Sequence, residues 1–132
     1  MRVKPSPIRT SCDVQTDPAR NLIHIQYIGH LTGAGMKGGV DAMRAALLKV
    51  RPGFTLLTDL TAMESMELDC VADLTKIMDL CRAHGVGTVV RIIPDPAKDI
   101  GLAMLGIVHY HGQRVHTVTC RSAAEAQRAL QR

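Results

Sequence analysis

Four acidic residues lie within ten positions near the middle of the chain: Glu64, Glu67, Asp69 and Asp73. Paired carboxyl groups can act as general acid and base, and clustered carboxylate oxygens are the ligands that hard cations prefer. No second cluster of histidine or aspartate is tied to these four by a recognised spacing. Because acidic side chains are also ordinary on the exposed face of a helix, we expect no catalytic residue and no metal site here.

Histidines and cysteines are the other residues that could bind a metal or act as a nucleophile. His109 and His111, with His116 nearby, could hold a metal from one face of an extended chain, but near a helix end their side chains would diverge, and histidine is favoured at helix C-termini. The cysteines are widely spaced and form no CxxC pair, so neither a zinc ribbon nor a thioredoxin-type site is indicated. We expect them to be reduced and mostly buried, and we expect no cofactor. The four are Cys12, Cys70, Cys81 and Cys120.

A glycine-rich segment, Gly29–Gly39, contains five glycines and could be compared with a phosphate-binding loop. Its sequence GAGMKGG matches neither GxGxxG after a central strand nor a P-loop with its Lys-Ser/Thr. We therefore interpret the segment as a flexible connection and do not expect nucleotide binding.

Hydrophobic periodicity predicts the elements that would position these residues. Period-2 alternation favours a strand at 22–28, and a nearly continuous apolar run favours a strand covered on both faces at 54–60. Ser122, with Glu125 three residues later, forms the capping box of a terminal helix, and Gly85 marks the end of an earlier helix. Further strands are expected at 86–93 and 115–120, an edge strand at 12–14, and helices at 40–50, 68–84, 99–112 and 122–130.

Strands that alternate with helices predict βαβ units and a mostly parallel sheet. We expect an α/β fold with a central sheet of four to five strands and about four helices. At 132 residues the chain has the length of one domain. Residues 1–21 are expected to be an irregular lead-in, and residues 22–132 a single domain.

Composition excludes several classes of partner. The net charge is +4, but the lysines and arginines are scattered, and an aromatic content of 2% cannot supply base-stacking platforms. We therefore expect no nucleic-acid partner. No apolar stretch reaches signal-peptide or membrane-span length, so we expect a cytoplasmic protein without a membrane span.

Residues 54–130 resemble the STAS domain of anti-sigma-factor antagonists in the layout of their elements. Thr58-Asp59-Leu60-Thr61 matches the family's strand-end motif, and Glu67-Leu68-Asp69-Cys70 falls where the family has Asp-Ser-Ser-Gly. The segment Ser122-Ala123-Ala124-Glu125-Ala126 is similar to the family's final capping segment. The resemblance implies a STAS-like fold and a non-enzymatic regulatory module that binds a protein partner, such as an anti-sigma factor or a related regulator, or a second copy of itself.

The chain departs from the family at the residue on which the family's phosphorylation cycle depends. Asp69 stands where the antagonists carry the phosphorylatable serine. One carboxylate has less charge and fewer acceptor oxygens than phosphoserine, so Asp69 is a partial and permanent mimic of it. We therefore expect the phosphorylation switch to be missing.

The candidate partner-binding site combines apolar and acidic side chains, a mixture that suits a protein interface. Helix capping alone would also explain Glu67 and Asp69, because carboxylates are favoured in the first turn of a helix. An alternative function is the binding of a small apolar, lipid-like ligand in a pocket lined by helix methionines and leucines. The site residues are Ser65, Met66, Glu67, Leu68, Asp69 and Cys70.

Overall fold

The computed structural model describes residues 11–95 and 115–131. Within them the chain forms six strands and three α-helices, with one short 3-10 turn, Pro18–Arg20, between the first two strands. The strands are β1 (Ser11–Asp17), β2 (Leu22–Leu31), β3 (Thr55–Asp59), β4 (Met63–Met66), β5 (Thr88–Ile92) and β6 (His116–Cys120). The helices are α1 (Gly33–Leu47), α2 (Cys70–Ala83) and α4 (Ala123–Leu130).

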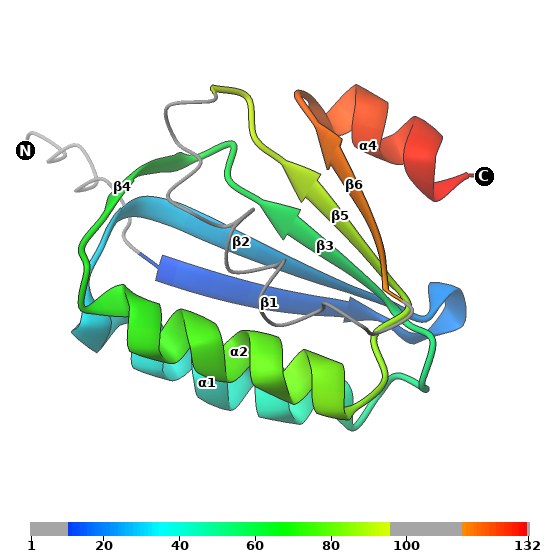
Figure 1. Cartoon of the computed structure of the whole chain (residues 1–132), viewed down its shortest axis with the longest axis horizontal. Helices are drawn as coiled ribbons and strands as arrows, with labels where there is room; N and C mark the ends of the chain where they lie inside the picture. The colour runs from blue at the N-terminus through cyan, green and yellow to red at the C-terminus, as the bar shows by residue number, and fades with distance from the viewer. Residues whose placement is uncertain (1–10, 96–114, 132) are drawn as a thin grey trace, which may run out of the picture.

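The strands form one six-stranded, mostly parallel sheet (Figure 1). Its order is β1-β2-β3-β5-β6, and β4 pairs with the far end of β2. Only β1 is antiparallel to its neighbour, and it pairs with β2 from Ser11 opposite Ile28 to Asp17 opposite Leu22. The predicted α/β class is therefore confirmed. The sheet has one strand more than the upper limit of the predicted four to five, because β4 was not expected.

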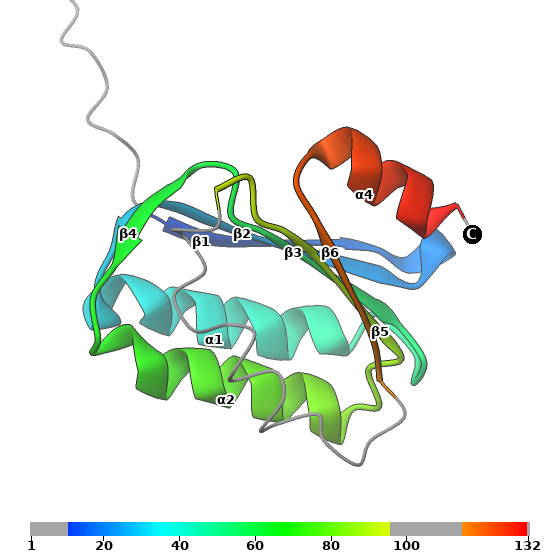
Figure 2. The same ribbon diagram turned by 45° about the horizontal axis from the view of Figure 1, so that its top comes forward.

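Helices cover both faces of the sheet (Figure 2). α1 and α2 lie side by side on one face, and α4 lies on the other. Each face has its own cluster of buried apolar residues. The central strand, β3, contributes to both clusters: Leu56 belongs to the cluster under α1 and α2, and its neighbour Leu57 belongs to the cluster under α4. This explains the continuous apolar run predicted to be covered on both faces.

Two helix ends predicted from the sequence, the start of α4 and the end of α2, are confirmed. Ser122 Oγ accepts a hydrogen bond from the Glu125 amide at 3.1 Å, and Glu125 Oε2 accepts one from the Arg121 amide at 2.7 Å. Gly85 follows α2 with φ of 88°, in the left-handed conformation that ends helices. The helix predicted at 99–112 lies outside the described residues. No helix in the described part of the chain is long and apolar enough to cross a membrane.

The interpretation of Gly29–Gly39 as a flexible connection is wrong. β2 continues through Gly29 to Leu31, and α1 begins at Gly33, well before the predicted start near residue 40. Thr32 caps the helix, with its Oγ1 accepting a hydrogen bond from the Gly35 amide at 3.3 Å. A Cβ atom at Gly39 would lie 2.5 Å from Cys12 Sγ, so glycine lets α1 pack closely against β1.

Candidate functional site

The predicted site residues lie on one continuous surface segment, residues 63–72, which we call the junction. It comprises β4, the turn after it and the start of α2. β4 pairs in parallel with the last residues of β2, with a shift of register between Gly29 and His30. The junction therefore lies beyond the carboxyl end of the main sheet, next to the start of α1 (Figure 1).

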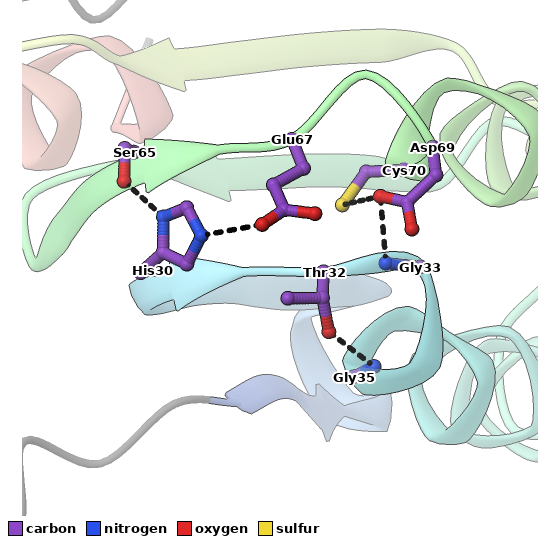
Figure 3. A network of polar contacts seen from close by, with 8 residues as sticks. All are labelled: His30, Thr32, Gly33, Gly35, Ser65, Glu67, Asp69 and Cys70. Atoms are coloured by element: carbon purple, nitrogen blue, oxygen red, sulfur yellow. Dashed lines mark hydrogen bonds and ion pairs between the residues drawn. The ribbon is translucent and has the colours of Figure 1, made fainter.

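His30, at the end of β2, joins two residues of the junction (Figure 3). Its Nδ1 atom is hydrogen-bonded to Ser65 Oγ, and its Nε2 atom lies 3.0 Å from Glu67 Oε1. The Glu67 amide also donates to the Leu31 carbonyl oxygen at 2.9 Å. The His30 and Glu67 side chains are about half exposed, 48% and 50%, so their contact contributes at most about 1 kcal/mol of stability. Its main effect is to fix the path of the junction.

Asp69 joins the junction to α1. Its Oδ1 atom accepts a hydrogen bond from the Gly33 amide at 3.0 Å, and so satisfies one of the free amides at the start of that helix. Asp69 is the N-cap residue of its own helix, α2, but its side chain makes no capping hydrogen bond there. The alternative explanation, that the Glu67 and Asp69 side chains only cap α2, is therefore not supported. Glu67 precedes α2 and contacts His30, and the Asp69 carboxylate accepts a hydrogen bond from the first turn of the neighbouring helix, α1.

Two apolar side chains of the junction face solvent. Leu68 is 89% exposed and Val71 is 39% exposed. Ser65, Glu67 and Asp69 are exposed beside them, and Met66 is partly buried against the core. Cys70 is fully buried, so it supports the junction from inside and is not part of its surface.

Three of the four carboxylates that could have formed an acid/base or cation site have separate partners. Glu67 pairs with His30, Asp69 with the Gly33 amide, and Asp73 with Lys76 at 3.8 Å. Among residues 11–95 and 115–131, no group of three or more His, Cys, Asp or Glu side chains is arranged to hold a metal ion.

All four cysteines are buried and unpaired, as predicted. Burial raises the pKa of the Cys12 and Cys81 thiols from 9.0 to about 12, and it also raises the pKa of Cys70 and Cys120. Thiols with a raised pKa stay protonated at neutral pH and are poor nucleophiles. Of the histidines considered as metal ligands, His116 is exposed at the start of β6, and His109 and His111 lie outside the described residues.

The sequence interpretation missed His30 and Gly33, and it also missed a second polar contact, between His24 and Asp59. Asp59 Oδ2 lies 3.1 Å from His24 Nε2, and Asp59 Oδ1 accepts a hydrogen bond from the Thr61 amide at 2.9 Å. The link to Thr61 is a local turn that an aspartate two residues earlier can signal. His24 and His30 each lie at least 35 positions from their partners, and no pattern within one sequence marks such pairs.

The cavity described in this structure lies between the sheet and α4, away from the junction. It has a volume of about 280 Å³ and is lined by Thr55, Thr88, Val90, His116, Val118, Ala129 and Leu130. The helix methionines and leucines expected to line an apolar pocket, such as Met36, Met43 and Leu74, are instead packed in the core.

Solved structures show that this fold is SpoIIAA-like, as the resemblance to STAS domains implied. An uncharacterized protein of the DUF3478 family with a SpoIIAA-like fold, from Shewanella loihica PV-4, matches with a TM-score of 0.66 and 14% identity over 98% of this chain and 99% of that chain. The anti-sigma factor antagonist SpoIIAA in its unphosphorylated form matches with a TM-score of 0.56 and 13% identity over 90% and 96%. An anti-sigma factor antagonist from Mycobacterium paratuberculosis matches with a TM-score of 0.56 and 16% identity over 92% and 94%.

No protein-family model matches the chain, and no curated protein matches its sequence. At these identities the solved structures establish a STAS-like fold.

Proposed function

We propose that the protein is a non-enzymatic regulatory module that binds another protein through the junction. The observation that carries the proposal is the exposure of Leu68, at 89%, between the carboxylates of Glu67 and Asp69. A single exposed leucine is ordinary, but Val71 adds a second apolar side chain three residues further on. Apolar contacts ringed by charged groups are typical of protein interfaces.

The junction is also held in place before any partner arrives. His30 bonds to Ser65 and Glu67, the Leu31 carbonyl oxygen accepts from the Glu67 amide, and Asp69 accepts from Gly33 (Figure 3). A surface already fixed in its bound shape loses less conformational entropy on association. The hydrogen bonds therefore favour binding by ordering the junction in advance.

Charge around the junction indicates the chemistry of the partner. The whole chain carries a net charge of +4, yet residues 52–75 contain five acidic residues and no lysine or arginine, and three of the five, Glu64, Glu67 and Asp69, are exposed. A complementary partner would present an apolar pocket for Leu68 with basic residues at its rim. An anti-sigma factor or a related regulator is the partner class we propose, supported by the similar fold of anti-sigma factor antagonists.

We further propose that phosphorylation does not switch this site. Asp69 stands where the related antagonists carry the phosphorylatable serine, and its carboxylate is already bonded to the Gly33 amide. The negative charge at this position is therefore permanent. Binding would be controlled by the amount of partner or by competition for the junction.

We place this activity in the cytoplasm. The four cysteines are buried thiols, the state that a reducing compartment maintains. Fractionation of the source cells would check this location directly.

The test is a binding titration with Leu68→Arg and a matched control, Leu48→Arg. Leu48 is equally exposed, at 88%, but lies at the far end of α1. We expect a partner isolated on the wild-type protein, and then purified, to bind the Leu48→Arg variant normally and the Leu68→Arg variant at least about tenfold more weakly. Equal binding of both variants by every partner isolated would contradict the proposal.

Small-ligand binding is the second candidate, favoured by the cavity beneath α4. Its volume of about 280 Å³ is at the lower limit of typical small-molecule sites, roughly 300–1,000 Å³, and its lining includes Thr55, Thr88 and His116. We rank this candidate second because so small and partly polar a space suits no lipid chain. Native mass spectrometry of protein purified from cells would support it by detecting a bound compound of defined mass.

A further inference from the structure

The two helices beneath the sheet run in the same direction, so their equivalent ends lie together. Asp69 at the start of α2 bonds to Gly33 at the start of α1. At the other end, His84 Nε2, just after α2, lies 2.9 Å from the Val50 carbonyl oxygen, just after α1. Figures 1 and 2 both show α1 and α2 side by side along their length.

Charge is divided between the two ends of this helix layer. The starting end carries the acidic junction. The opposite end carries Arg44 in the last turn of α1 and the following Lys49 and Arg51, all exposed. We call Arg44, Leu48, Lys49 and Arg51 the basic end. The division has exceptions, since Lys37 in the second turn of α1 is an exposed basic residue at the acidic side, and Asp79, 3.8 Å from Arg82 near the end of α2, is an acidic residue at the opposite end.

Charge division by itself does not indicate a partner, because acids near helix N-termini and bases near C-termini stabilise the helices that carry them. The leucines have no such explanation. In the described part of the chain, the large hydrophobic residues that are exposed are Leu48, Leu68 and Val71. One lies in the middle of the basic end and two lie in the junction. Each charged end therefore contains at least one apolar side chain that the fold leaves exposed to solvent.

We propose that the basic end binds the junction of a second copy of this chain. Leu48 of one molecule would lie against Leu68 and Val71 of the next, with Arg44, Lys49 and Arg51 facing the acidic residues. This inference rests on the proposed function, because it uses the same junction, and it adds the basic end as a second contact surface. A copy bound to the junction would compete with any other protein partner.

The two ends lie far apart within one molecule. α1 has 15 residues, so at about 1.5 Å per residue the two ends are about 22 Å apart. This separation exceeds the Debye length of about 8 Å at physiological salt, so the ends do not neutralise each other within one molecule. Two arrangements pair the junction with the basic end of another copy. They are an antiparallel two-fold dimer, in which the contact is made twice, and a head-to-tail arrangement, which forms rings or filaments.

Analytical ultracentrifugation of the wild type and of the Leu48→Arg and Leu68→Arg variants tests the assembly. We expect the wild type to self-associate as its concentration rises towards millimolar. Each variant alone should associate at least about tenfold more weakly, since each has lost one apolar contact. An equimolar mixture should form a one-to-one dimer, because Leu48→Arg keeps an intact junction and Leu68→Arg keeps an intact basic end.

A wild-type protein that stays monomeric, or a mixture that gives no one-to-one dimer, would overturn the inference. Failure of this inference is distinguishable from failure of the proposed function. If only the self-association is wrong, Leu68→Arg still loses the other protein partner and Leu48→Arg still binds it. If only the proposed partner binding is wrong, both variants impair self-association and neither changes the capture of any other protein.

Discussion

Asp59 ends the central strand, and its environment acts on the pKa of its carboxyl group in two opposite directions. Burial alone would raise the pKa, but hydrogen bonds from His24 and Thr61 outweigh it and lower the pKa from 3.8 to about 2. The folded state therefore favours the ionised form more than the unfolded state does. The resulting stabilisation is fully present above pH 3.8 and is lost as the pH falls towards about 2.

Replacing Asp59 with asparagine should lower the free energy of unfolding by about 2 kcal/mol at neutral pH, because lowering a pKa by one corresponds to about 1.4 kcal/mol. Urea unfolding at a series of pH values would measure the loss. The difference between wild type and variant should shrink below pH 3.8. Asp41→Asn, an exposed site on α1, is the control and should change stability by no more than about 0.5 kcal/mol. A constant difference at all pH values would contradict the assigned cause.

Contacts between residues differ in how far they can be predicted from sequence. The pair Ser122 and Glu125 was predicted because both residues belong to one helix start, and their spacing alone sets the contact. The bond between Asp69 and the Gly33 amide was not predicted, since it joins residues 36 positions apart. Asp69 was correctly predicted at a helix start. Which helix donates a hydrogen bond to its carboxylate depends on how the two helices pack, and the sequence alone does not show this.

At the scale of elements, the start of α1 and the start of α2 depend on each other. A Cβ atom at Gly33 would lie 2.9 Å from Asp69 Oδ2 and 3.2 Å from the Asp69 carbonyl oxygen. Any larger residue at position 33 must therefore move the turn before α2. The absence of a side chain at Gly33 allows the hydrogen bond that fixes the junction.

Gly33→Ala should destabilise the protein by about 1–3 kcal/mol, the usual cost of overpacking a close contact, and should weaken partner binding as well. Gly38→Ala is the matched control on the same helix, because a Cβ atom there meets nothing within 4 Å. This control should be stabilised by about 0.4–1 kcal/mol through reduced freedom of the unfolded chain. Chemical unfolding of both variants would measure the effects, and equal effects would rule out the close contact as the cause.

Two parts of the fold, β4 and the first turns of α1, were not predicted, each for its own physical reason. β4 has the sequence MESM, which does not alternate between apolar and polar residues, and it is a strand because the end of β2 offers it unpaired backbone groups. The first turns of α1 are rich in glycine, which disfavours helix, yet the Thr32 cap and the bond to Asp69 stabilise them. Longer elements such as α2 and β3 were predicted because their own periodicity or apolar run is sufficient.

At the scale of the whole molecule, the two faces of the sheet have different roles in this account. The face covered by α1 and α2 contains the larger core cluster, and its helix layer carries the acidic junction at one end and the basic end at the other. The other face carries α4 and the cavity beneath it. Partner binding is assigned to the first face, so the second should be unaffected by it.

Amide hydrogen exchange on the complex with the isolated partner tests the central claim most directly. The Leu48→Arg variant should be used, so that self-association does not contribute. Binding through the junction predicts slower exchange of the amides of residues 63–72, with α4 and β6 unchanged. Slower exchange confined to α4 and β6, with residues 63–72 unchanged, would contradict the account.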